Sequence, residues 1–214
     1  MKAVELIIFN LDGTLIDSRQ DITNAVNFAL RNFGLKEKSI QEVSSYIGWG
    51  VEDLIRKSLG EKQKIYFKQT LSLFEEYYKK HSNDNSVLYP GVKEILGYFK
   101  GKRKIVITNR NYGFAVLTLR IAGIYDNFED IVGGDDIGCM KPSSCPLDRA
   151  VCRLDIDRER AIIIGDMDID ILAGKKAGII TCGVTYGIGK IEDIKNAKPD
   201  YLIDNILQLK DIVK

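Results

Sequence analysis

The stretch "LIIFNLDGTLIDS", residues 6–18, decides the fold of this chain. Its first four residues are apolar, and the sequence then changes at once to a polar turn that contains Gly13. A continuous apolar run of this kind is typical of a strand buried on both faces, as in a parallel sheet covered by helices. The stretch therefore predicts an α/β core whose first strand, over residues 4–9, ends in a polar loop.

Apolar runs of strand length recur along the rest of the chain. They cover residues 104–108, 130–134, 161–165, 179–184 and, more weakly, 200–204. Apolar residues at helical spacing lie between them, for example over residues 92–99 and 147–154. Strands that alternate with helices in this way predict βαβ units and a Rossmann-like parallel sheet.

The segment between the first two predicted strands has a different pattern. No strand signal occurs from about residue 19 to 87, and apolar residues at helical spacing cover residues 22–33, 51–59 and 71–78. Pro90 and Gly91 then mark the return to the sheet. We expect a small α-helical cap domain over residues 16–87, inserted into a core domain formed by residues 1–15 and 88–214.

The overall composition is that of an ordinary globular protein, with 45% hydrophobic and 29% charged residues among 214. A formal net charge of +1 gives no indication of a nucleic acid or an anionic membrane as partner. The N-terminus has no signal-peptide layout, and no segment reaches ~18 uninterrupted apolar residues. We therefore expect a cytoplasmic protein with no nucleic-acid or membrane partner, either a monomer or a small homo-oligomer.

The four cysteines show no metal-binding pattern. Cys139, Cys145, Cys152 and Cys182 form no CxxC pair, and the single histidine, His81, lies far from them in the sequence. This spacing argues against a zinc site. In a reducing cytosol the four side chains are expected to be free thiols.

Polar side chains gather where the predicted strands end, which is where open α/β sheets bind their ligands. They are Asn10, Asp12, Gly13 and Thr14 after the first strand, Thr108 and Asn109 after the second, and Asp166, Asp168 and Asp170 after the run 161–165, with Lys141 in the preceding loop. Carboxylate and carbonyl oxygens suit Mg²⁺, and hydroxyl, amide and ammonium donors suit a phosphoryl group. Each signal alone has an ordinary structural explanation as a turn, a helix cap or a surface lysine. Their joint occurrence predicts a metal-plus-phosphate site.

These residues resemble the four sequence motifs of the haloacid dehalogenase superfamily of phosphohydrolases. The motifs read "NLDGT" (10–14), "TN" (108–109), "KP" (141–142) and "GDMDID" (165–170) here, and the resemblance covers essentially the whole chain. The helical insertion resembles the cap of the phosphoglycolate phosphatase-like group, and "YIGWG" (46–50) resembles the cap loop that enters the active site in that group. The resemblance thus implies substrate contacts from Gly48, Trp49 and Gly50.

The resemblance also implies a role for each site residue. The side chain at position 10 is the nucleophile of the family and forms an aspartyl-phosphate, while Asp12 is the general acid and base. The family's Mg²⁺ is held by the side chain at position 10, the Asp12 carbonyl and Asp166. Phosphoryl oxygens are bound by Thr108 and Lys141.

Three further positions complete the implied site. Gly13 and Asn109 contribute to phosphate and substrate binding. Asp170 lies behind the site, where it orients Lys141 or a metal-bound water. The expected activity is Mg²⁺-dependent hydrolysis of a small phosphorylated metabolite, phosphoglycolate first among them.

This chain departs from the family pattern at Asn10, where the family has the nucleophilic aspartate. An amide can coordinate Mg²⁺ weakly, but it cannot form the acyl-phosphate, so little or no turnover is expected. Three origins of Asn10 stay open: an engineered replacement, a natural loss and an artefact. Two other functions also stay open, a non-catalytic metabolite-binding protein and a sugar-phosphate mutase of the β-phosphoglucomutase type, for which Arg56, Lys57 and Lys62 are candidate second-phosphate ligands.

Overall fold

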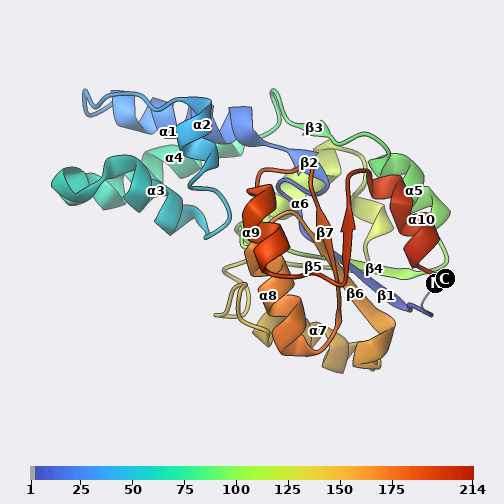
Figure 1. Ribbon diagram of the computed structural model, residues 1–214. Helices are drawn as coiled ribbons and strands as arrows, with labels where there is room; N and C mark the ends of the chain where they lie inside the picture. Colours follow the sequence, from blue (N-terminus) through green and yellow to red (C-terminus); the bar gives the residue numbers. More distant parts are fainter. Residues whose placement is uncertain (1–2) are drawn as a thin grey trace.

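A six-stranded parallel sheet forms the centre of the molecule, as the sequence predicts (Figure 1). The computed structural model describes residues 3–214, so that Met1, Lys2 and the side chain of Lys62 lie outside the described part. The strands follow one another across the sheet in the order β5 (Asp130–Val132), β4 (Arg103–Ile107), β1 (Leu6–Phe9), β6 (Ala161–Gly165), β7 (Ile180–Val184) and β8 (Tyr201–Ile203). Every neighbouring pair in this order is parallel.

Helices cover both faces of the sheet, which explains why the strands are apolar along their whole length. In β1, Ile7 and Phe9 pack under one face, and Leu6 and Ile8 pack under the other. The first face is covered by α5 (Val92–Tyr98), α6 (Tyr112–Ile121) and α10 (Leu209–Ile212). The second face is covered by α7 (Cys145–Arg153) and α8 (Asp168–Ala177), with α9 (Ile191–Asn196) beside α8. The chain also forms four 3-10 helices among the described residues, η1 (Glu61–Tyr66), η2 (Tyr125–Asn127), η3 (Arg158–Arg160) and η4 (Ile206–Gln208).

Four of the helices between the first two core strands form a separate layer to one side of the sheet (Figure 1). They are α1 (Arg19–Arg31), α2 (Ile40–Ser44), α3 (Val51–Leu59) and α4 (Phe67–His81). Their apolar stripes pack on one another in a core of their own, in which Val26, Ile55 and Phe74 are buried. This helical layer is hereafter called the cap.

Two short strands join the cap to the core, and the sequence does not predict them. They are β2 (Ile16–Asp17) and β3 (Val87–Leu88), which pair antiparallel. With two residues each they are too short for a periodicity signal. The buried Asp21 carboxylate also stabilises this connection between cap and core, because it accepts hydrogen bonds from the backbone and side chains of Asn85 and Ser86.

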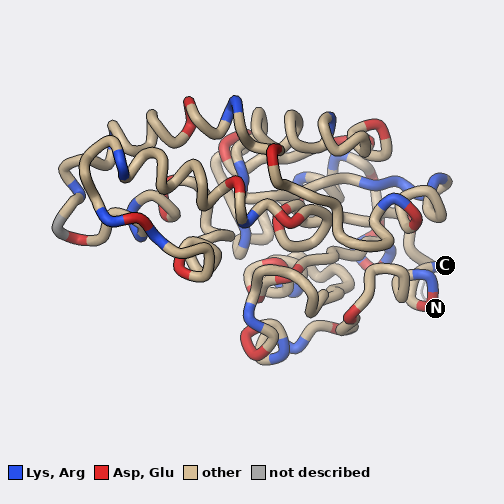
Figure 2. The backbone as a smooth tube through the Cα atoms, turned by 90° about the horizontal axis from the view of Figure 1, so that it is seen from above, with Lys and Arg blue, Asp and Glu red and all other residues tan. Residues whose placement is uncertain are grey.

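Charged residues of both signs are interspersed along the core and the cap (Figure 2). Within the part of the chain that the structure describes, none of the helices has the length and apolar character needed to cross a bilayer.

Candidate active site

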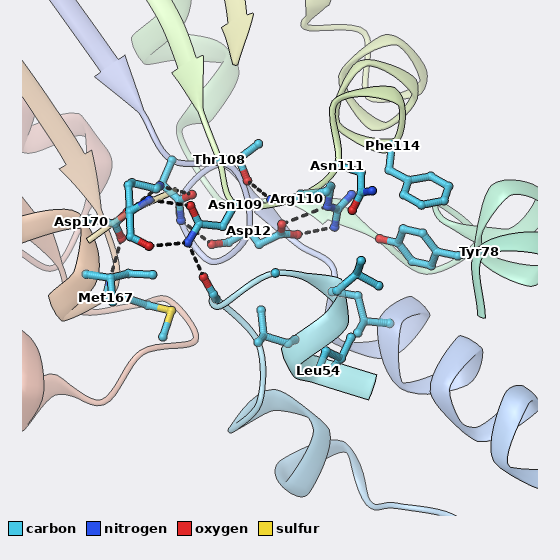
Figure 3. Close-up of a pocket in the computed structure, with 18 of the residues that line it drawn as sticks. Asp12, Leu54, Tyr78, Thr108, Asn109, Arg110, Asn111, Phe114, Met167 and Asp170 are labelled. Atoms are coloured by element: carbon cyan, nitrogen blue, oxygen red, sulfur yellow. Dashed lines mark hydrogen bonds and ion pairs between the residues drawn. The ribbon is translucent and has the colours of Figure 1, made fainter. Parts of the chain in front are cut away.

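The polar residues that follow separate strands meet at one edge of the sheet, beneath the cap (Figure 3). Asn10 follows β1 and Thr108 follows β4, while Asp166 follows β6. Lys141 reaches the same place from the loop between β5 and α7. All four side chains are buried. Because the carboxyl ends of parallel strands lie at one edge of a sheet, the topology alone brings these distant residues together.

The Asn10 side chain is hydrogen-bonded at both ends. Its Nδ2 donates to the backbone oxygen of Asp12 at 2.9 Å and to Oδ1 of Asp166 at 3.1 Å. Its Oδ1 accepts from Nζ of Lys141 at 3.0 Å. The amide therefore uses both of its N–H groups and one acceptor position inside the site.

Lys141 is a buried ammonium whose three donor positions are all occupied. Besides Asn10, Nζ donates to Oδ1 of Asp170 at 2.7 Å and to the backbone oxygen of Ile107 at 2.8 Å. Only 1% of either side chain of the Lys141–Asp170 pair is exposed. A buried ion pair of this kind needs additional hydrogen bonds to offset the loss of hydration, and both partners have them.

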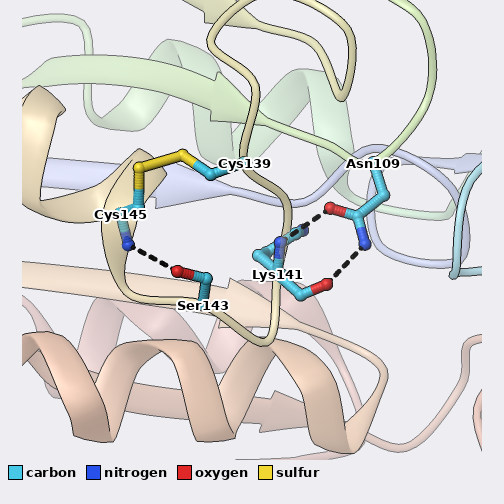
Figure 4. The surroundings of a disulfide bond; sticks show 5 residues. All are labelled: Asn109, Cys139, Lys141, Ser143 and Cys145. Carbon is cyan, nitrogen blue, oxygen red and sulfur yellow. Dashed lines mark hydrogen bonds between the residues drawn. A yellow bond between two sulfur atoms is a disulfide. The ribbon is translucent and has the colours of Figure 1, made fainter.

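The Asn109 side chain holds the backbone of Lys141 (Figure 4). Its Oδ1 accepts from the Lys141 N–H at 3.0 Å, and its Nδ2 donates to the Lys141 carbonyl at 2.8 Å. Nδ2 also donates to the carbonyl of Gly48 in the cap loop at 2.8 Å. Its side chain therefore positions Lys141 and the cap loop, whereas the sequence predicts a direct contact with phosphate.

The loop that carries Lys141 is closed by a disulfide between Cys139 and Cys145 (Figure 4). The prediction that all four cysteines are free thiols is wrong for this pair, and only Cys152 and Cys182 are free. A tight loop brings these two residues, six apart in the sequence, to a Cα–Cα distance of 6.2 Å, which a disulfide spans. Neither CxxC spacing nor the expected compartment indicates such a loop.

We expect replacement of both bridged cysteines by serine to lower the free energy of unfolding by about 2 kcal/mol, because the unfolded chain regains the entropy that a short closed loop removes. Thermal unfolding under non-reducing conditions measures the effect. Cys152→Ser, at an exposed free cysteine, is the matched control. Four reactive thiols in the denatured, unreduced protein would contradict the bridge.

Asp166 is fully buried and accepts four hydrogen bonds. Its Oδ1 accepts from Asn10 and from the Thr14 hydroxyl at 2.9 Å. Its Oδ2 accepts from the backbone N–H groups of Ile188 at 2.9 Å and Gly189 at 3.2 Å. Burial raises the pKa of Asp166 to about 6, with a further contribution from the nearby Asp170 carboxylate, while the hydrogen bonds act in the opposite direction.

Gly13 allows the first loop to approach this carboxylate closely. Its φ of +80° is a conformation that side chains disfavour, and a Cβ atom there would lie 1.9 Å from Oδ2 of Asp166. Position 13 therefore has to be glycine for the first loop and Asp166 to meet.

The carboxylate of Asp12 is bound by Arg110, to which sequence reasoning assigned no role. Arg110 donates through Nε to Oδ2 at 3.0 Å and through Nη2 to Oδ1, and the Ser18 hydroxyl also donates to Oδ1. Arg110 also donates to Thr118 and lies over the ring of Tyr78. The sequence signal for Arg110 was its position, since a cationic side chain shortly after the end of β4 is expected near the site.

A cavity of about 70 Å³ opens between these core residues and the cap. Asn10, Asp12, Thr108 and Lys141 line its polar end. The cap lines the rest with mainly apolar side chains, namely Ile22, Ile47, Val51, Leu54, Phe74 and Tyr78. Gly48 and Gly50 of the cap loop also line the cavity. The side chain of Trp49, predicted to contact substrate, is not among the lining residues and is 43% exposed.

The residues present do not fit a divalent cation in the arrangement that the structure shows. Asp166 is the only carboxylate of the expected ligand set, and the described residues contain no group of three His, Cys, Asp or Glu side chains placed to hold a metal. The two oxygens expected to bind Mg²⁺, from Asp12 and Asp166, both accept from the amide nitrogen of Asn10.

Comparisons with known proteins agree on one family. The sequence profile of the haloacid dehalogenase-like hydrolases matches residues 7–184. The chain is 32% identical to the phosphoglycolate phosphatase of Nitrosococcus oceani and 35% identical to that of Vibrio cholerae, over 100% of this chain and 98% of each relative. The crystal structure of a predicted phosphoglycolate phosphatase from Haemophilus somnus 129pt superposes with a TM-score of 0.94 at 30% identity, over 99% of both chains.

Proposed function

This chain belongs to the haloacid dehalogenase-like hydrolases, and on that premise we propose that its pocket binds a small phosphomonoester which it hydrolyses little or not at all. The observation that carries the proposal is the buried ammonium of Lys141, 3.0 Å from the Asn10 side chain at the polar end of the cavity. Phosphoglycolate is the first candidate ligand, because the relatives are phosphoglycolate phosphatases.

We propose that the phosphoryl group binds at the polar end of the cavity, which Thr108 and Lys141 line. The Thr108 hydroxyl is assigned as a hydrogen-bond donor to a phosphoryl oxygen, whereas Lys141, whose three N–H groups are already used, contributes its positive charge. Asn109 acts indirectly, because its side chain fixes the Lys141 backbone. Asp170 has a similar positioning role, through its ion pair with Lys141.

The residue at position 10 accounts for the expected lack of turnover. A carboxylate there attacks phosphorus through one oxygen while the bond from phosphorus to the ester oxygen breaks, and Asp12 donates a proton to that leaving oxygen. The neutral amide of Asn10 does not form this bond. In the present arrangement the Asp12 carboxylate is also occupied by Arg110, so proton transfer requires Asp12 to leave that pair.

Mg²⁺ is proposed as cofactor only for a form of the protein with aspartate at position 10. The carbonyl of Asp12 and the carboxylate of Asp166 would then join the new carboxylate at position 10 as oxygen ligands. The ion neutralises negative charge on a bound phosphoryl group.

A sugar-phosphate mutase needs a second phosphate site in the cap. Of the residues suggested for a second phosphate, Arg56 and Lys57 pair with Glu52 and Asp53 on the exposed surface of α3 and do not line the cavity. A metabolite-binding protein without turnover stays the second candidate, favoured by Asn10 itself.

Tyr78 is proposed to form a hydrogen bond with the part of the ligand beyond the phosphoryl group. It is almost fully buried in the cavity wall, and its hydroxyl points toward Arg110 in Figure 3 but forms no well-aligned hydrogen bond with that guanidinium or with any other described residue. A buried hydroxyl without a partner costs about 1–3 kcal/mol, which a ligand oxygen recovers on binding.

We expect Tyr78→Phe to weaken phosphoglycolate binding about tenfold and to change the stability of the free protein little, because the hydroxyl that is removed has no well-aligned hydrogen bond there. Calorimetric titration of the Asn10 chain measures the affinity, and an assay for free phosphate checks that the ligand stays intact. Tyr89→Phe is the matched control, since its hydroxyl is also buried without a partner but lies outside the cavity. Equal affinities for both variants would remove Tyr78 from the ligand site, and absence of binding to the parent chain would count against phosphoglycolate.

A further inference from the structure

We infer that the Asn10 amide takes the place of the divalent cation in this chain, so that the site holds its shape without Mg²⁺ and does not bind that ion. The expected cation would lie between the Asp12 carbonyl and the Asp166 carboxylate. That position is spanned by the Nδ2 group of Asn10, at 2.9 Å and 3.1 Å from the two oxygens. The inference concerns cation binding alone, so it is independent of the identity of the ligand.

Lys141 determines which end of the Asn10 amide faces the two oxygens. Its Nζ is a donor with no acceptor capacity, and it lies 3.0 Å from Oδ1 of Asn10. If the amide were flipped, its N–H groups would meet the ammonium, and its oxygen would meet the oxygens of Asp12 and Asp166. The hydrogen-bond network therefore assigns the orientation that points the amide nitrogen at the cation position.

Lys141 cannot easily move away to allow the flip. Its ammonium also donates to Asp170 and to the Ile107 carbonyl. The N–H and the carbonyl of its backbone are both hydrogen-bonded to the Asn109 side chain. The same ammonium suits an aspartate at position 10 equally well, because one oxygen of a carboxylate can face Lys141 while the other faces a cation. In asparagine an NH₂ group stands in the place of that second oxygen, and this group is a hydrogen-bond donor.

Asp166 needs no cation to satisfy its lone pairs. Its four hydrogen bonds come from Asn10, the Thr14 hydroxyl and the backbone N–H groups of Ile188 and Gly189. A carboxylate offers about four acceptor positions, so all are filled. A cation would have to displace Asn10 first, and it would then find only one anionic ligand.

The formal charges of the buried cluster of Lys141, Asp166 and Asp170 support the same inference. Lys141 supplies one positive charge against the carboxylates of Asp166 and Asp170, and the three side chains are all buried. Asn10 adds no charge to this cluster. An aspartate at position 10 adds a third carboxylate, and like charges in a buried site destabilise one another unless a cation joins them. The inference therefore predicts that one substitution creates both the binding site and the need for the ion.

The test compares the Asn10 chain with Asn10→Asp by two measurements that need no catalysis. Thermal unfolding is recorded in EDTA and in Mg²⁺, and Mn²⁺ binding is followed by the loss of the free-ion signal in electron paramagnetic resonance. Asn196→Asp is the matched control, because it adds the same charge at the end of α9, away from the site.

The Asn10 chain and Asn196→Asp are expected to unfold at the same temperature in EDTA and in Mg²⁺, and to leave millimolar Mn²⁺ free. Asn10→Asp is expected to unfold about 5–10 °C lower in EDTA, to recover in Mg²⁺, and to bind Mn²⁺ at least ~100-fold more tightly than the Asn10 chain. Stoichiometric Mn²⁺ binding by the Asn10 chain would overturn the inference without any variant. So would an Asn10→Asp protein that responds to neither ion.

Discussion

Asn10→Asp is expected to raise the rate of phosphomonoester hydrolysis by at least ~10⁴-fold, which corresponds to about 5 kcal/mol in the activation barrier. The reason is local. The side chain at position 10 lies beside the Lys141 ammonium at the polar end of the cavity, where Thr108 also lies. A carboxylate in that position becomes a nucleophile with its phosphate-binding partners already in place.

The rate is measured as phosphate release from phosphoglycolate and from an aryl phosphate in the presence of Mg²⁺. Asn10→Ala controls for the loss of the amide without the gain of a carboxylate, and it is expected to be as inactive as the parent chain. An Asn10→Asp protein that folds, binds cations and still hydrolyses none of a panel of phosphomonoesters would favour the metabolite-binding alternative.

Lys141→Met is expected to lower the free energy of unfolding by about 3–5 kcal/mol, and so to lower the unfolding temperature by roughly 10 °C. The substitution removes the donor from three buried acceptors, on Asp170, Asn10 and Ile107. The Asp170 carboxylate is then buried without its ion-pair partner, and this is the larger part of the cost.

A double variant separates the lost ion pair from a simple packing defect. Adding Asp170→Asn to Lys141→Met removes the unpaired charge, and we expect it to restore about half or more of the lost stability. Lys175→Met, at an exposed lysine of α8, controls for the change of side chain. Equal unfolding temperatures for Lys141→Met and Lys175→Met would show that the buried pair does not stabilise the fold.

The core sheet was predictable because its strands are apolar on both faces. Residues 6–9 read as one continuous apolar run, and the structure buries alternate members of that run against helices on opposite sides. The two-residue strands β2 and β3 were not predictable, because pairing between the chain segments that enter and leave the cap leaves no periodic pattern in either one.

The site residues could be named from the strand ends, but their hydrogen bonds could not. The orientation of Asn10 depends on Lys141, which lies 131 residues further along the chain, and no local pattern encodes which amide end meets it. The pairing of Arg110 with Asp12 likewise joins residues 98 apart. The disulfide depends on the path of a single loop. In each case the missing information was three-dimensional.

The most direct test of the account is to trap the phosphorylated chain. Both proteins are incubated with an aryl phosphate, quenched in acid and digested, and the phosphorylated peptide is located by mass spectrometry. The account predicts one phosphoryl group on residue 10 of the Asn10→Asp protein, released by hydroxylamine as an acyl-phosphate is, and none on the Asn10 chain. Phosphate on any other residue, on the Asn10 chain, or on neither protein despite rapid hydrolysis by Asn10→Asp would contradict it.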